Sequence, residues 1–260
     1  MKQDMPAMFA GHGSPMNAIE DNRFRRGMHE AAQTLPRPEA ILCISAHWET
    51  EGVCLTASPA PATIHDFYGF PKALHEARYP APGHPALARR VAGLLPGAQL
   101  DESRGFDHGC WGVLLPMYPD AQIPVVQLSL DRRLSAQQHY ALARSLAPLR
   151  EEGILILGSG NIVHNLGRIG FHSPQGAPWA VRFNRHVKQC ILDNGIDALA
   201  AYDSFGPEAA LSVPTPEHFL PLLYVLAVRR SDDHVQWFND AELMNSLSMT
   251  SFVLTAKQGD

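Results

Sequence analysis

Histidine is the residue type in this chain that is best suited to chemistry, and 13 of the 260 residues are histidines. Its imidazole titrates near neutral pH, and the neutral ring is the commonest metal ligand in proteins. His12 lies between two glycines directly after an apolar run, and His47 closes the apolar run at 41–47. His164 lies shortly after the apolar run at 154–157. These three positions are candidates for one metal site.

Two further histidines occur in contexts that favour a site. Before His218, Thr215 can act as a helix N-cap and Pro216 as the first helical residue, which places His218 in the first turn. Pro221 predicts a kink or a later start of that helix, because proline lacks an amide donor. His108 lies in a segment flanked by glycine and aromatic residues, which we interpret as a loop.

A single histidine near a strand end is more often a hydrogen-bonded core or surface residue than a ligand. Four such positions weaken this interpretation, although none has the short spacing of a zinc site on one helix. His65, beside Asp66, is left open between a site and a structural role. The remaining histidines are predicted to lie on the surface, and they are His29, His75, His84, His139, His172, His186 and His234.

The elements that must position these residues alternate along the chain. Apolar runs at 7–10, 40–46, 124–130 and 153–157 are predicted strands, and helices are predicted at 85–95, from Ser135 to about 150, and at 178–193. Ser135 and Gln138 have the spacing of a capping box. This alternation predicts a layered α/β fold, with residues 1–260 as one domain. Because ligands bind at the carboxyl ends of strands in such sheets, we expect the histidines to converge there.

Proline and glycine are concentrated at 58–85, so regular structure is not expected in this segment. A long irregular loop in a compact domain is typically a lid or a wall of a site. The aromatic stretch at 67–70 can supply an apolar wall, and ordinary packing explains it equally well.

Composition excludes several classes of protein. With 45% hydrophobic and 18% charged residues the chain predicts a packed globule rather than a disordered one. A net charge of −5 argues against a protein that binds nucleic acid through a broad basic surface. No signal peptide or membrane-spanning run is visible, so a cytoplasmic location is predicted. The four cysteines are predicted to be reduced thiols. The two Gly-x-Gly turns, at 11–13 and 158–160, lack the third position of a dinucleotide fingerprint.

Six motifs together resemble the class III extradiol ring-cleaving dioxygenases, in particular the branch of 4,5-DOPA dioxygenase-like enzymes. The resemblance extends over most of the chain, and the joint order of the motifs is what makes it specific. They are Gly-His-Gly-Ser-Pro at 11–15, Ser-Ala-His-Trp at 45–48, His-Asp-Phe-Tyr-Gly-Phe-Pro at 65–71, Asp-His-Gly-Cys-Trp at 107–111, Gly-Ser-Gly-Asn-Ile-Val-His at 158–164 and Pro-Thr-Pro-Glu-His at 214–218.

The resemblance implies a mixed central sheet flanked by helices, with a metal near the carboxyl ends of the strands. His12, His47 and His218 correspond to positions near the metal. His164 corresponds to a histidine that either completes the metal shell or acts as acid and base. His108 corresponds to a histidine on the substrate side.

The metal and the substrate are less closely defined by the resemblance. Other class III enzymes hold Fe(II) with two histidines and a carboxylate, whereas a shell of His12, His47, His164 and His218 also suits zinc. We expect Fe(II) to support activity and Zn(II) to occupy the same site readily. Relatives usually carry a histidine where this chain has Val213, which removes a polar group that can help to hold substrate.

The activity that the resemblance implies is the opening of a catechol ring, of L-DOPA or a related catechol, by O₂ to give a muconic semialdehyde. We assign proton transfer to His164, with His108 placing or protonating the substrate. The expected partners are small molecules, and the expected state is a monomer or small homo-oligomer. Two alternatives remain: a zinc hydrolase with Glu217 as base, and a metal-stabilised binding protein without catalytic activity.

Overall fold

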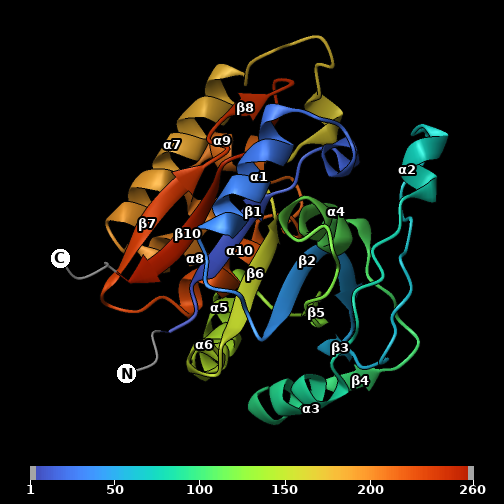
Figure 1. Cartoon of the computed structure of the whole chain (residues 1–260). Coiled ribbons are helices and arrows are strands. Elements are labelled where there is room, and N and C mark those ends of the chain that lie inside the picture. Colours follow the sequence, from blue (N-terminus) through green and yellow to red (C-terminus); the bar gives the residue numbers. More distant parts are fainter. Residues whose placement is uncertain (1–3, 257–260) are drawn as a thin grey trace.

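The structure of the protein is a computed structural model that describes residues 4–256. Within this range an eight-stranded mixed sheet runs through the molecule in the order β4-β3-β5-β2-β6-β1-β10-β7 (Figure 1). β5, β2, β6 and β1 run parallel to one another, and β10 pairs antiparallel with both β1 and β7. The strands of this sheet are β1 (Ala7–Gly11), β2 (Ala40–Thr50), β3 (Cys54–Thr56), β4 (Gln99–Asp101), β5 (Val125–Asp131), β6 (Ile154–Gly160), β7 (Asp233–Phe238) and β10 (Ser251–Ala256). A separate ribbon consists of β8 (Glu242–Leu243) and β9 (Leu247–Ser248).

The helices cover both faces of the sheet. The α-helices are α1 (Arg23–Gln33), α2 (Lys72–Glu76), α3 (Pro85–Leu94), α4 (His108–Met117), α5 (Ala136–Ala143), α6 (Pro148–Glu151), α7 (Pro178–Leu192), α8 (Ile196–Ala200), α9 (Pro207–Ser212) and α10 (Leu220–Ala227). Short 3₁₀ turns are η1 (Pro15–Ala18), η2 (Arg144–Leu146), η3 (Leu166–Arg168) and η4 (Tyr202–Phe205). The predicted mixed sheet flanked by helices is confirmed.

Two hydrophobic cores lie on opposite faces of the sheet, because successive strand residues point to opposite sides. In β1, Ala7 and Phe9 join the core shared with α3, α5, α7 and α10, whereas Met8 and Ala10 join the core shared with α1 and α4. β1, β5 and β6 are buried along their whole length, which explains why their sequences are continuous apolar runs rather than alternating ones. All four strands predicted from such runs are present.

The helix predicted from Ser135 to about residue 150 begins as expected. Ser135 accepts a hydrogen bond from the amide of Gln138, whose side chain in turn accepts one from the amide of Ser135. The helix is divided into α5, η2 and α6, with Pro148 opening the last piece. His139 in α5 is fully buried, so its predicted surface position is wrong. Its Nδ1 lies 2.9 Å from the hydroxyl of Tyr224 in α10.

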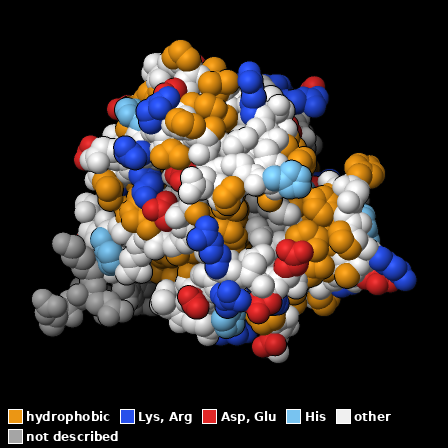
Figure 2. All heavy atoms as spheres, turned by 90° about the horizontal axis from the view of Figure 1, so that it is seen from above, with side chains coloured by type: hydrophobic (Ala, Val, Ile, Leu, Met, Phe, Trp, Pro, Cys, Tyr) orange, Lys and Arg blue, Asp and Glu red, His pale blue; other side chains and the backbone are white. Residues whose placement is uncertain are grey.

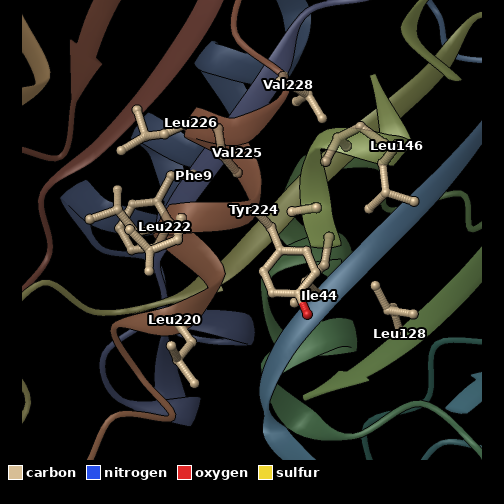
Figure 3. Close-up of a cluster of buried hydrophobic side chains, with 14 of the residues drawn as sticks. Phe9, Ile44, Leu128, Leu146, Leu220, Leu222, Tyr224, Val225, Leu226 and Val228 are labelled. Atoms are coloured by element: carbon tan, nitrogen blue, oxygen red, sulfur yellow. The ribbon is translucent and has the colours of Figure 1, made fainter. Parts of the chain in front are cut away.

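The helix that follows the Pro-Thr-Pro stretch starts late, as Pro221 indicated. α10 begins at Leu220, and Thr215 does not cap it, because its hydroxyl donates to the carboxylate of Glu217 instead. His218 therefore lies in a turn before α10 rather than in its first turn. α10 is buried on nearly every side, and Figure 3 shows its Tyr224 among apolar side chains of the sheet and of neighbouring helices.

The segment at 58–85 is largely irregular, as predicted, although it contains the short helix α2. The loop predicted around His108 is wrong: His108 is the first residue of α4, which Asp107 caps by accepting from the amide of Cys110 at 3.0 Å. All four cysteines lie in the described chain as free thiols, and Cys43 and Cys110 are buried. No helix in residues 4–256 is long and apolar enough to cross a membrane.

Candidate metal centre

The carboxyl ends of β1, β2 and β6 meet at one edge of the sheet, at the top of Figure 1. His12 directly follows β1, and its amide donates to the carbonyl of Gly160 at the end of β6, at 3.1 Å. His47 was predicted to end its strand, but β2 continues past it. The pairing of β2 with β5 shifts register between Ile44 and Glu49, and His47 lies within that irregularity. Such irregularities commonly redirect a side chain next to a site.

His164 and His218 reach the same edge from the other side of β6. The amide of His164 donates to the carbonyl of Ser212 at 2.9 Å. The carbonyl of His218 accepts from the amide of Asn161 at 2.8 Å, which ties the turn before α10 to the end of β6. A Cβ atom at Gly160 would lie 2.1 Å from that carbonyl oxygen. Glycine is therefore required at residue 160 for the turn to come this close.

The four histidines predicted to surround a metal are brought together. The Nε2 atoms of His12 and His47 lie 3.2 Å apart. The ring centroid of His218 lies 5.2 Å from that of His12 and 5.0 Å from that of His47. His164 stacks on His218 with a centroid distance of 3.5 Å and an interplanar angle of 5°.

His108 also joins this cluster, with its ring centroid 3.9 Å from that of His47. The potential ligand atoms form two adjacent groups, in each of which all atoms lie within 4.8 Å of one another. One group is His12, His47 and His108, and the other is His164, Glu217 and His218. The predicted ligand set thus draws on both groups, and His108, which was predicted on the substrate side, shares a group with His12 and His47.

Two carboxylates contact the histidines. Asp66 Oδ1 lies 3.0 Å from His108 Nδ1 and accepts from the amide of His108 at 2.9 Å, while Oδ2 lies 3.9 Å from His47 Nδ1. Glu217 Oε1 lies 3.0 Å from His218 Nδ1. Carboxylates in such positions fix the tautomer and orientation of imidazoles that bind metals. Sequence reasoning assigned no role to Asp66, although it lies in one of the six motifs that carry the family resemblance.

Burial sets the charge of the cluster. It lowers the pKa of His12 and His218 well below 6.5, and nearby imidazoles lower both further. Burial, together with His108, lowers the pKa of His47 to about 3, and burial lowers the pKa of His164 to about 4. Burial alone would raise the pKa of Asp66, but its contacts with His108 lower it to about 2. Near neutral pH these four rings are neutral and Asp66 is ionised.

The donor set fits a divalent metal ion. Metal binding needs deprotonated imidazoles, and the lowered pKa values provide them. Two nitrogens bound to one tetrahedral metal at about 2.0–2.1 Å lie roughly 3.3 Å apart, and the Nε2 atoms of His12 and His47 match this separation. The Nε2 atom of His218 is buried and has no hydrogen-bond partner in the described chain, which would be costly without a ligand. His12 Nδ1 lies 3.1 Å from Ser159 Oγ on β6, which holds its ring.

The start of α4 packs tightly against β2. A Cβ atom at Gly109 would lie 2.4 Å from Ser45 Oγ and 2.7 Å from His47 Cδ2. Ser45 Oγ donates to Asp107 Oδ1 at 2.7 Å, so β2 and the cap of α4 are joined directly. This contact fixes His47 and His108 relative to each other.

A pocket of about 860 Å³ opens above the histidines. All five site histidines line it, and so do Phe67 and Phe70 from the irregular segment. The predicted apolar wall is therefore present. Figure 2 looks onto this edge of the sheet and shows hydrophobic side chains gathered on the side that carries α2.

Two other residues singled out in the sequence lie away from the cluster. His65 Nε2 lies 2.9 Å from the carbonyl of Ala77, and its ring packs near Trp111, so its role is structural. Val213 is buried in the hydrophobic core and is not among the described residues that line the pocket.

Known proteins resemble this chain over most of its length. The family described as "Catalytic LigB subunit of aromatic ring-opening dioxygenase" matches residues 6–254. A protein of Escherichia coli strain K12 named 4,5-DOPA dioxygenase extradiol is 49% identical over 253 residues, which cover 95% of this chain and 93% of that protein.

More distant relatives carry the same name. The 4,5-DOPA dioxygenase extradiol of Beta vulgaris is 40% identical over 222 residues, covering 82% of this chain and 83% of that protein. A crystal structure of an uncharacterized protein from Escherichia coli K12 superposes with a TM-score of 0.84 at 44% identity, covering 96% of this chain and 99% of the other.

Proposed function

This chain belongs to the LigB family of aromatic ring-opening dioxygenases, and on that premise we propose that it opens the ring of a catechol with O₂ to give a muconic semialdehyde. The family indicated by the six sequence motifs is thus confirmed, and the chain is an extradiol ring-cleavage dioxygenase. The observation that carries the finer proposal is the group of neutral, buried imidazoles beneath an open pocket.

For the metal we propose His12, His47 and His218 as ligands, with His164 either completing the shell or exchanging protons with the substrate. The 3.2 Å separation of the first two Nε2 atoms and the unpartnered Nε2 of His218 support this set. We propose Fe(II) as the working metal, and we expect zinc to compete for the same nitrogens. When bound, the metal would supply the site at which the two catechol oxygens and O₂ meet.

The proton transfers fall to the chain's own side chains. His164 is neutral near pH 7, because burial lowers its pKa to about 4, so one ring nitrogen has a lone pair available for the proton of a catechol hydroxyl that a bound metal would make more acidic. A low pKa also makes the protonated ring a ready donor later in the reaction. His108, whose Nδ1 lies 3.0 Å from the ionised Asp66, lines the same pocket and is proposed to orient or protonate the substrate.

The zinc-hydrolase alternative is not favoured. It needs Glu217 as a general base, yet this carboxylate contacts His218 Nδ1 and accepts from the Thr215 hydroxyl. Both contacts suit a group that orients a ligand. The alternative of a binding protein without catalytic activity is not supported by the family, whose members open aromatic rings.

Activity is tested by reconstituting the protein anaerobically with Fe(II) and adding catechol, 4-methylcatechol or L-DOPA with O₂. We expect O₂ uptake and a yellow ring-opened product. If no catechol in the panel causes O₂ uptake above a sample loaded with Zn(II), the dioxygenase proposal is wrong for this chain.

The role of His164 is tested with His164→Ala. If it moves protons, the variant retains about one metal ion per chain, while kcat falls on the order of 10²–10⁴-fold, the usual contribution of general acid–base catalysis. Metal content is measured by atomic absorption beside the turnover rate. Loss of the metal itself would instead assign His164 to the shell.

A further inference from the structure

Next to His12, the pocket is lined by two residues of the loop that follows β1, Gly13 and Ser14. Both residues are partly buried. Neither of their backbone amides has a hydrogen-bond acceptor among the described residues, although most N–H groups removed from solvent are paired in a folded chain. Two adjacent donors of this kind in the lining of a concave site are suited to binding a polar group of a ligand.

The direction of the first amide follows from the carbonyl beside it. The carbonyl of His12 accepts from the side-chain amide of Asn17 at 3.1 Å, and the peptide bond between His12 and Gly13 is trans. In a trans peptide the C=O and N–H bonds point in opposite directions, so the amide of Gly13 faces away from Asn17. Asn17 is buried and does not line the pocket, which leaves the pocket side of the loop for this N–H.

The conformation of this loop requires glycine at residue 13. Its φ is +58°, in the left-handed region, and a Cβ atom there would collide with Met249 Sδ. Turns that present successive backbone N–H groups form concavities that bind anions. Among residues 4–256, no lysine or arginine lines the pocket, so an anionic substituent on the substrate must rely on donors other than these side chains.

The charge around the loop also favours an anion. His12 is a proposed metal ligand, and a divalent metal bound to it would add positive charge directly beside Gly13. The two carboxylates of the lining, Asp66 and Glu217, each contact a histidine. A carboxylate at the loop would therefore gain two backbone donors and the attraction of the metal.

We infer that the backbone amides of Gly13 and Ser14 bind the carboxylate of an anionic substituent on the catechol, and so determine which catechols the site prefers. This inference rests on the proposed function, since it names the groups that recognise the substituent of its substrate. A pocket of about 860 Å³ is large for a catechol ring alone and leaves room for a side chain that reaches the loop. Hydrogen bonds to a carboxylate are stronger than those to a neutral oxygen, so the anion is selected over an uncharged group of the same shape.

A matched pair of substrates isolates the carboxylate. 3-(3,4-Dihydroxyphenyl)propanoate and its primary amide have nearly the same shape, and only the first is anionic. We expect the Fe(II)-loaded protein to bind the acid about tenfold more tightly than the primary amide, measured by anaerobic calorimetry, and to show the same preference in kcat/KM once O₂ is admitted. Equal binding, or tighter binding of the primary amide, would overturn the inference. Preferential binding of the acid without O₂ uptake from any catechol would overturn the proposed function instead.

Variants at residue 14 assign the preference to the backbone. Ser14 has a φ of −71°, which proline also adopts, so Ser14→Pro removes the N–H and retains this φ. We expect it to reduce the ratio of acid to primary-amide affinity about fivefold, the difference between a charged and a neutral acceptor for one hydrogen bond. Ser14→Ala keeps the N–H and lacks only the hydroxyl, which accepts from the amide of Met16, so it should keep the wild-type ratio.

Arg168 is the alternative partner for a carboxylate. It lies between the lining residues Leu166 and Ile169 in sequence, is exposed and is not itself part of the lining. Arg168→Ala should keep the wild-type ratio if the backbone amides bind the carboxylate. If Arg168→Ala abolishes the preference, or if Ser14→Pro and Ser14→Ala change it equally, the inference is wrong. Should Ser14→Pro not fold, the ratio measured for Arg168→Ala decides between the two partners.

Discussion

At the scale of single residues, Asp66 is central because one carboxylate contacts two rings of the site. Its Oδ1 accepts a hydrogen bond from the backbone amide of His108 and also lies 3.0 Å from His108 Nδ1. Its Oδ2 lies 3.9 Å from His47 Nδ1. Its low pKa keeps it ionised throughout the neutral range. A charged group that aligns two imidazoles stabilises one arrangement of their nitrogens and increases their basicity toward a metal.

Asp66→Asn should therefore lower metal affinity or kcat/KM by on the order of 10–100-fold, the usual cost of losing such a partner. The amide is nearly the same size but lacks the charge and offers a single acceptor oxygen. Fe(II) titration and steady-state kinetics measure the two effects. Asp232→Asn, at an exposed position, is the control and should change neither. Wild-type values for Asp66→Asn in both measurements would contradict this role.

The histidines of the site could be predicted from sequence because each lies in a distinctive local context. His12, His47 and His164 follow or close apolar runs, and the topology of parallel strands then brings them to one edge. Asp66 could not be assigned in the same way, because its partner His108 is 42 residues away in an element that was predicted as a loop. Long-range contacts of this kind depend on the fold.

At the scale of elements, the contact between α4 and β2 sets the distance between His47 and His108. Gly109 is the point of closest approach, since a Cβ atom there meets both Ser45 and His47. The helix itself was missed in the sequence because two glycines and Pro116 weaken its pattern. Asp107 at the N-cap was the signal that could have revealed it.

Gly109→Ala should displace His47 and reduce kcat/KM by on the order of 100-fold, because small misplacements of catalytic groups carry such costs. Gly112→Ala, one turn further along α4, is a matched control with no atom within 4 Å of its new Cβ. It should retain activity and stabilise the protein by about 0.5–1 kcal/mol through higher helix propensity. Kinetics and thermal unfolding of both variants test this pair, and equal activities would show that the close contact is not needed.

β7, which sequence reasoning missed, is partly exposed, so its sequence lacks a continuous apolar run, and it joins the edge of the described sheet by pairing with β10. The helix begun by Ser135 was predicted to be continuous to about residue 150, but it is divided into three pieces, because the capping box fixes a start and not the path that follows. The four buried central strands were predictable because burial on both faces of the sheet requires nearly every residue to be apolar.

At the scale of the whole molecule, burial of neutral histidines on several elements links stability to pH. His12, His47, His164 and His218 at the site, together with His139 between α5 and α10, all have lowered pKa values. The unfolded chain binds protons at these rings below about pH 6.5, while the folded chain does not until lower pH. The contribution of these neutral rings to the free energy of unfolding is therefore fully present above about pH 6.5 and decreases progressively as the pH falls.

His139 isolates this effect because it lies apart from the proposed metal ligands and contacts Tyr224. Burial lowers the pKa of His139 from 6.5 to about 4. At about 1.4 kcal/mol per pKa unit, protonation of this ring in the unfolded chain should lower the free energy of unfolding by about 2 kcal/mol between pH 7 and pH 5. His139→Asn cannot titrate in this range. At pH 7 the free energy of unfolding of this variant should be lower than that of the wild type, because a buried ring is lost. Between pH 7 and pH 5 it should fall by about 2 kcal/mol less than that of the wild type.

Urea unfolding of the chelator-treated protein at pH 7 and pH 5 measures this difference without a contribution from bound metal. His186→Asn, at an exposed position on α7, serves as the control and should keep the pH dependence of the wild type. If His139→Asn and the wild type lose the same free energy between the two pH values, burial of His139 does not contribute to acid sensitivity. The expected result would show that a histidine away from the catalytic edge restricts the pH range in which the fold, and with it the cluster of neutral imidazoles, persists.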